Sequence, residues 1–101
     1  MKIVAVCACI MGVAHTYMAA ESIQKAAEAA GHEIKVETQG ATGFDNKITA
    51  DEVANASAVI LTTDIPIRER ERFAGKKIFN VSTTAMIKNS TKIIEAVEKN
   101  V

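Results

Sequence analysis

The apolar and polar positions at the start of the chain predict a buried strand followed by a long helix. Residues 2–7 are rich in Val and Ile with little alternation, which is typical of a parallel strand covered on both faces. Between residues 15 and 30, small and apolar residues recur at helical spacing, and Gly31 is a typical helix end. These positions are Ala19, Ile23, Ala26, Ala27 and Ala30. Their small side chains predict that the helix packs closely against its neighbours.

The second predicted strand, residues 33–38, has two different faces. Apolar Ile34 and Val36 alternate with charged positions. The face that carries Lys35 and Glu37 is expected to meet solvent, and this strand is expected to lie at an edge of the sheet.

The middle of the chain predicts a loop, a short helix and a central strand. Residues 39–47 contain glycine and are predicted to form the loop. Thr49, with Glu52 three residues later, matches a capping box for a helix through about residue 55. The strongly apolar run 57–62 then predicts a strand inside the sheet.

The C-terminal part predicts a fourth strand at residues 77–81 and two helices. Ser82 or Thr83 is expected to cap a short helix through residue 88, and Ser90 to cap the last helix. The side chains expected to face inward from the last helix are Ile93, Ile94 and Val97.

Strands that alternate with helices predict an α/β fold, with residues 1–101 as a single doubly wound domain. Its sheet is expected to be parallel, with helices on both faces. Ligands of such folds bind beyond the carboxyl ends of the strands, where Cys9 follows the first strand. The other strand ends bring further polar residues to the same rim: Thr38, Gln39, Thr62, Thr63, Asp64 and Ser82.

Composition narrows the class of protein. A chain of 101 residues with 49% hydrophobic content suits one compact core, and twelve basic residues balance twelve acidic ones. With three Phe, one Tyr and no basic excess, nucleic acid is not an expected partner. The apolar start resembles a secretory signal, but its removal would delete the first strand, and it is shorter than the ~20 residues of a membrane span. We therefore expect a soluble, cytoplasmic protein.

The two cysteines are expected to be reduced thiols, because Cys7 and Cys9 lack the two-residue spacer of a redox pair. Cys7 is predicted to point into the core. Together with His15 and His32 the cysteines match no standard zinc spacing, so no metal is expected. His32 follows a helix end, where a cation is favourable, and needs no further role.

The candidate chemistry lies between the first strand and the first helix. A thiol at such a turn faces unpaired N–H groups and the positive end of the helix dipole, which bind an anion and favour the thiolate. Cys9 and His15 have the Cys-x5-Arg-Ser/Thr spacing of cysteine phosphatases, with His in place of Arg. Cys9 is the predicted catalytic residue, and the predicted phosphate-binding loop that follows it comprises Ile10, Met11, Gly12, Val13, Ala14, His15 and Thr16. The simpler interpretation is a buried cysteine with a capping threonine and an incidental histidine.

Several roles stay open at this point. Gly12 either allows close backbone approach to phosphate or is an ordinary turn glycine. Thr16 either donates its hydroxyl to the thiolate or caps the helix. Asp64 invites comparison with the general acid of small phosphatases, but a plain polar residue after a strand is the better interpretation. The charge run 68–72 is typical of a solvated helix face.

Three motifs together resemble the fructose-type enzyme IIB domains of the bacterial phosphoenolpyruvate-dependent sugar phosphotransferase system (PTS). They are CIMGVAHTYMAAE at residues 9–21, VETQG at 36–40 and ERFAGK at 71–76. The family pattern usually has Pro followed by Thr or Ser after the cysteine, where this chain has Ile10 and Met11.

The resemblance implies a four-stranded sheet of order 2-1-3-4 and a phosphoryl relay. Cys9 would accept phosphate from a phosphohistidine on a IIA protein and pass it to a fructose-class sugar bound by a membrane IIC permease. No cofactor is implied, and the protein would meet the inner face of the membrane transiently through IIC. The alternatives are a small cysteine-dependent phosphatase, against which the missing Arg counts, and a regulatory module that only senses an anion.

Overall fold

Four parallel strands and one short antiparallel strand form the sheet, in the order β3-β2-β1-β4-β5. The computed structural model describes residues 1–9, 13–41 and 43–101. The parallel strands are β1 (Lys2–Ala8), β2 (Glu33–Gly40), β4 (Ala58–Thr62) and β5 (Ile78–Val81). Their relative order is the predicted 2-1-3-4, and β4 is central as expected.

The additional strand, β3 (Gly43–Asp45), corrects the predicted loop at residues 39–47. It pairs antiparallel with the end of β2, with Gly40 opposite Gly43. Gly43 has a φ of 125°, which side chains other than glycine rarely adopt, so this residue permits the tight return. The sheet therefore has five strands, and β2 is not at its edge.

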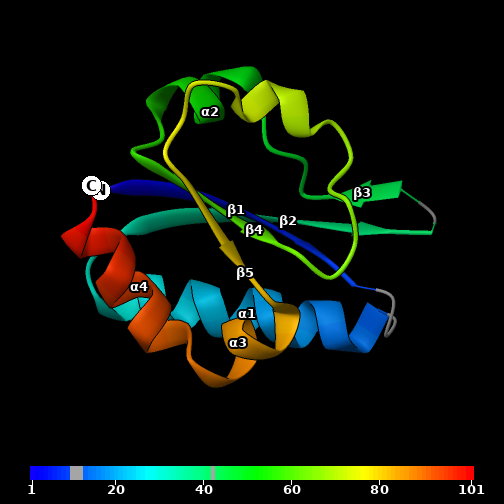
Figure 1. Ribbon diagram of the computed structural model, residues 1–101, viewed down its shortest axis with the longest axis horizontal. Helices are drawn as coiled ribbons and strands as arrows, with labels where there is room; N and C mark the ends of the chain where they lie inside the picture. Colours follow the sequence, from blue (N-terminus) through cyan, green and yellow to red (C-terminus); the bar gives the residue numbers. More distant parts are fainter. Residues whose placement is uncertain (10–12, 42) are drawn as a thin grey trace.

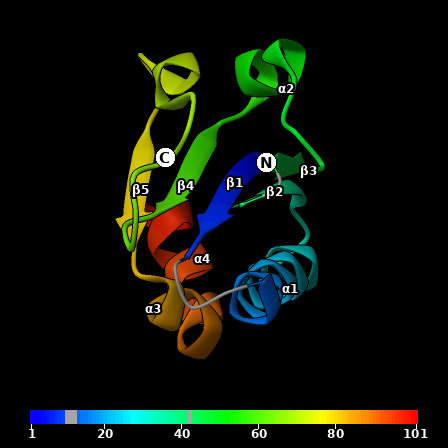
Figure 2. The same ribbon diagram turned by 90° about the vertical axis from the view of Figure 1, so that its right-hand side faces the viewer.

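Helices cover both faces of the sheet, as predicted (Figures 1 and 2). One face carries α1 (Val13–Ala29), α3 (Thr83–Lys88) and α4 (Ser90–Lys99). The other carries α2 (Ala50–Asn55) and the short 3-10 helix η1 (Arg70–Phe73). Among the described residues, no helix has the length and apolar character needed to cross a membrane.

Each face of the sheet has its own hydrophobic core. Apolar residues of α1 pack against β1 from one side, since Ala19, Ile23 and Ala27 are fully buried beside Cys7. On the opposite side, Phe73 of η1 and Val53 of α2 close the second core. Ile94 and Val97 of α4 are buried and Ile93 packs beside them, so the predicted inward face is confirmed.

The helix ends confirm most of the predicted caps. Thr49 and Glu52 form the reciprocal capping box of α2, and the Ser82 hydroxyl accepts from the N–H of Ala85 at the start of α3. The cap of α4 is Asn89, so the prediction for Ser90 is wrong, because the chain passes from α3 to α4 with a single residue between them. The helix α1 begins at Val13, two residues before the predicted start.

Candidate functional site

Cys9 lies at the carboxyl end of β1, four residues before α1 begins. Its side chain is partly buried, and its Sγ lies 3.2 Å from Nδ1 of His15 in the first turn of α1. The structure therefore brings together the two residues whose spacing suggested a phosphate loop. The N-terminal turn of a 17-residue helix beside the thiol offers N–H groups and a positive dipole end.

The predicted loop is only partly within the described residues. Ile10, Met11 and Gly12 lie outside them, so the roles expected of these residues stay predictions. Val13, Ala14, His15 and Thr16 form the first turn of α1. Thr16 is buried and is the fourth residue of the helix, so it is not the residue that caps α1.

Thr62 holds the residue that precedes Cys9. Its Oγ1 accepts from the N–H of Ala8 at 2.9 Å and donates to the C=O of Ala8 at 3.1 Å. The backbone pairing of β1 with β4 ends at Val6 and Leu61, so the Thr62 hydroxyl continues the contact between the two strands beyond that point. A buried hydroxyl thus fixes the backbone that leads directly into Cys9.

Asp64 is an anchored carboxylate at the same rim. Its Oδ1 accepts from the N–H and the hydroxyl of Thr83, both at 2.6 Å. Partial burial raises the pKa of Asp64, but the hydrogen bonds from Thr83 outweigh burial, and the nearby His15 adds to the lowering. A carboxyl with a lowered pKa has no proton to give near neutrality, which favours the plain polar interpretation over a general acid.

Cys7 has the opposite environment to Cys9. It is fully buried in the core under α1, and its thiol donates to the sulfur of Met86 at 3.2 Å. Burial raises the pKa of Cys7 to about 12, so this thiol stays protonated and unreactive. The prediction that Cys7 is a core residue is confirmed.

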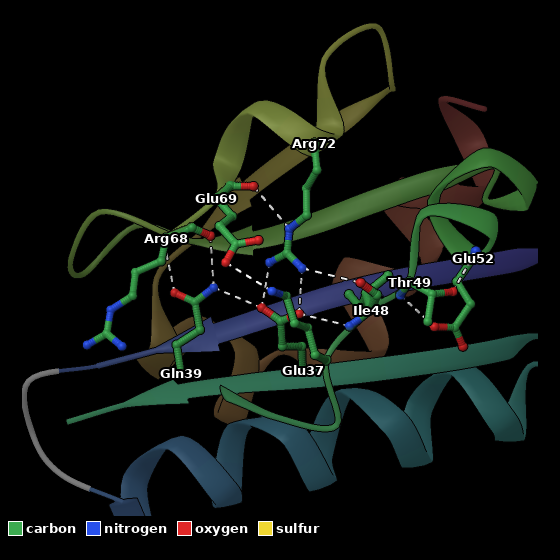
Figure 3. A network of polar contacts seen from close by, with 9 residues as sticks. Glu37, Gln39, Ile48, Thr49, Glu52, Arg68, Glu69 and Arg72 are labelled. Carbon is green, nitrogen blue, oxygen red and sulfur yellow. Dashed lines mark hydrogen bonds and ion pairs between the residues drawn. The ribbon is translucent and has the colours of Figure 1, made fainter. Parts of the chain in front are cut away.

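A buried ion pair, which was not predicted from the sequence, joins Glu37 of β2 to Arg72 of η1 (Figure 3). Glu37 is fully buried, and its two oxygens accept from Nη1 and Nη2 of Arg72 at 2.7 and 2.5 Å. The N–H of Ile48 and the amide of Gln39 donate to the same carboxylate, at 2.9 and 2.8 Å. The expectations that Glu37 meets solvent and that Arg72 belongs to a solvated face are both wrong.

This pair connects two of the motifs that were singled out separately. Glu37 and Gln39 belong to VETQG, and Arg72 belongs to ERFAGK. Burial alone would raise the pKa of Glu37, but the hydrogen bonds from Arg72, Gln39 and Ile48 together lower it. The carboxylate therefore stays ionised inside the protein.

The remaining rim residues lie where the parallel sheet predicts them. Thr63 donates its N–H to the C=O of Val81 at 2.8 Å, which joins the ends of β4 and β5.

His32 lies beyond α1, where its Nε2 is 2.6 Å from a carboxylate oxygen of Glu98 in α4. No cluster of three or more metal-ligating side chains occurs in residues 1–9, 13–41 and 43–101.

Comparison with known proteins places this chain in one family. A family model described as "PTS system, Lactose/Cellobiose specific IIB subunit" matches residues 4–96. The "PTS system fructose-like EIIB component 2" of Escherichia coli K12 is 54% identical over 97 residues, which is 96% of this chain and 92% of that protein. Component 1 of the same strain is 41% identical over 98 residues, which is 97% of this chain and 91% of that protein.

Solved structures agree with the sequence relatives. A domain of the fructose-specific IIABC component from Borrelia burgdorferi has a TM-score of 0.90 and 49% identity, with 97% of this chain and 93% of that chain covered. The Enzyme IIB subunit of the PTS from Escherichia coli K12 has a TM-score of 0.91 and 41% identity, with 97% and 91% covered. The chain belongs to the IIB family of the PTS, and as such a component it relays phosphoryl groups in sugar uptake. This role implies IIA and IIC partners.

Proposed function

We propose that Cys9 is the residue that carries the phosphoryl group. It would accept the group from a phosphohistidine of a IIA protein and pass it to a fructose-class sugar held by a membrane IIC permease. The observation that carries this proposal is the placement of a partly buried thiol between β1 and the start of α1, with His15 at 3.2 Å from its sulfur. Cys7 is the other thiol, and its burial and raised pKa exclude it.

The relay consists of two substitutions at phosphorus. In the first, the thiolate of Cys9 forms an S–P bond while the P–N bond of the donor breaks, and the donor imidazole leaves with the electron pair and takes up a proton. In the second, a sugar hydroxyl forms an O–P bond, the S–P bond breaks, the thiolate returns and the hydroxyl proton goes to a base. N–H groups at the start of α1 would hold the phosphoryl oxygens in both steps.

The sugar class and the partners rest on similarity. Relatives that are 54% and 41% identical are named fructose-like EIIB components, and the three sequence motifs resemble fructose-type domains. We therefore propose a fructose-class sugar, a separate or linked IIA donor, and contact with the inner face of the membrane through IIC. Residues 1–101 would act as one cytoplasmic domain in this relay.

The test is a reconstituted phosphorylation followed by intact mass measurement. The protein is incubated with phosphoenolpyruvate, the two general PTS proteins and candidate IIA partners, and one added phosphate is expected. Cys9→Ser should not accept phosphate at the wild-type rate. The matched control Cys7→Ser should be labelled normally if it is folded. A label that maps to His15, His32 or a hydroxyl would contradict the assignment.

The same preparation tests the alternative function as a phosphatase. A phosphatase would turn over an aryl phosphate steadily and would not retain phosphate through isolation. The anchored, ionised Asp64 counts against steady turnover of an aryl phosphate, because it has no proton to give to the leaving phenolate near neutrality.

A further inference from the structure

Gln39 connects the ion pair of Glu37 and Arg72 to the backbone of Arg68 (Figure 3). We call the two hydrogen bonds between Gln39 and the Arg68 backbone the clamp. The side-chain carbonyl of Gln39 accepts from the N–H of Arg68 at 2.8 Å, and its amide donates to the C=O of Arg68 at 3.1 Å. The same amide donates to Glu37 at 2.8 Å, and Gln39 is only 4% exposed. Gln39 therefore holds Arg68 in the way that a neighbouring strand would.

The clamp lies next to the point at which Cys9 leaves the sheet. Gln39 is opposite Ala8 in the register of β1 and β2, and Ala8 directly precedes Cys9. Adjacent strands are separated by about 4.8 Å. The backbone of Arg68 is thus fixed over the active end of the sheet, although Arg68 is 59 positions away from Cys9 in the sequence (68 minus 9).

The two arginines of this network have different environments. The guanidinium of Arg72 is committed to Glu37, whereas the side chain of Arg68 is exposed. Within the described part of the chain, no ion pair involves Arg68. Its guanidinium carbon lies 6.0 Å from the ring centre of Phe44, which is a distant contact. Figure 3 shows its guanidinium turned away from the network, toward the end of the sheet where β1 and β2 finish.

A guanidinium stabilises a phosphoryl group during its transfer. A phosphoryl group in transfer spreads negative charge over three oxygens, and a guanidinium binds two of them with one fork. The loop after Cys9 has His15 where a cysteine phosphatase has its arginine.

A buried ion pair adds little stability compared with apolar residues of similar volume, so the value of the pair of Glu37 and Arg72 lies in the geometry that it fixes.

We propose that Arg68 binds the phosphoryl group on Cys9 from outside the cysteine loop, and that Gln39 is the positioning residue that presents it. This inference rests on the proposed function, since it requires the phosphate to be on Cys9. Glu37, which is paired with Arg72, accepts a hydrogen bond from the Gln39 amide and so helps to fix the orientation of Gln39. Arg68 thereby supplies the bidentate contact that the loop lacks.

The first experiment uses inorganic phosphate to protect Cys9 against iodoacetamide, with Arg68→Gln, Arg68→Lys and the matched control Arg70→Gln. Arg70 is an exposed arginine of η1, two residues further along and outside the clamp. Loss of one charge-assisted fork should weaken phosphate protection about ten- to a hundredfold in Arg68→Gln. Arg68→Lys should be intermediate and Arg70→Gln should stay within about twofold of wild type. Equal protection in Arg68→Gln and Arg70→Gln would overturn the proposal.

The second experiment tests the positioning role of Gln39. Gln39→Met removes both bonds to the Arg68 backbone but leaves the guanidinium in the chain, and it should weaken phosphate protection nearly as much as Arg68→Gln. A purely structural role would instead lower the urea midpoint and leave the protection of the folded fraction unchanged. Phosphorylation of Cys9 by IIA is measured alongside. A wild type that takes no label on Cys9 refutes the proposed function, whereas normal labelling kinetics in Arg68→Gln refute only the role of Arg68.

Discussion

Arg72→Met removes the two guanidinium hydrogen bonds, at 2.7 and 2.5 Å, that neutralise the carboxylate of Glu37. Two donors remain, the N–H of Ile48 and the amide of Gln39, but no cation stays at the carboxylate of this fully buried residue. Breaking a buried ion pair on one side costs about 3–5 kcal/mol. A domain of this size has about 5–15 kcal/mol in total, so we expect a folded but marginal variant at neutral pH.

The same substitution should reverse the contribution of Glu37 to the pH dependence of stability. In the wild type its pKa is lowered, so its stabilisation is present above the unfolded pKa of about 4.3 and is lost as the pH falls through the folded pKa. Without Arg72, burial dominates and raises the pKa of Glu37. The variant should therefore lose stability as the pH rises from about 4.3 through this raised pKa, because the buried group must then ionise.

Urea unfolding followed by far-ultraviolet circular dichroism, at pH 5 and pH 7, measures both effects. Arg70→Met is the matched control, since Arg70 is exposed on the same short helix, and it should change the free energy of unfolding by less than about 0.5 kcal/mol. The double variant Glu37→Met with Arg72→Met should recover most of the loss, because neither charge remains buried. If Arg72→Met costs no more than Arg70→Met, or shows the wild-type pH dependence, our account of the pair fails.

Three further predictions concern the site. In the native protein iodoacetamide should modify Cys9 and spare Cys7, whose pKa is raised to about 12; equal rates for the two thiols would contradict the structure. Thr62→Val should slow phosphorylation of Cys9 by IIA because the hydroxyl that holds Ala8 is lost, while Thr62→Ser should retain the wild-type rate. Matching rates for the Val and Ser variants would argue against this role of the Thr62 hydroxyl. His15→Ala should slow phosphorylation of Cys9 by IIA about tenfold, since one hydrogen bond to the sulfur is removed. Rapid-quench kinetics at neutral pH measure this rate, and an unchanged rate would contradict the prediction.

Much of the architecture follows from local sequence patterns. The apolar run of β1 and the stripe of α1 each specify an element without reference to any distant residue. Cys9 could be assigned to the carboxyl end of the parallel strands for the same reason, because its position depends only on the strand before it and the helix after it. The contact with His15 spans six residues and is also local.

The strand β3 could not be predicted from its own residues. Only three residues pair with β2, and the apolar content of Gly43–Asp45 is too low to mark a strand. It forms because β2 offers unpaired backbone groups beside it and glycine permits the return. An element of this kind is determined by the edge that it completes rather than by its own pattern.

The burial of Glu37 marks the limit of what the sequence by itself determined. Alternation along β2 assigns Glu37 correctly to the face opposite Ile34, but alternation carries no information on what covers that face. Arg72, 35 residues away, and the N–H of Ile48 make burial of the charge tolerable, and both arrive only when η1 and the segment before α2 pack on the sheet. The sequence determined the four parallel strands, the first helix and the position of Cys9 between them, because these depend on neighbouring residues. Tertiary structure alone decided the ion pair and the clamp on Arg68, because a carboxylate enters the core only where distant donors meet it.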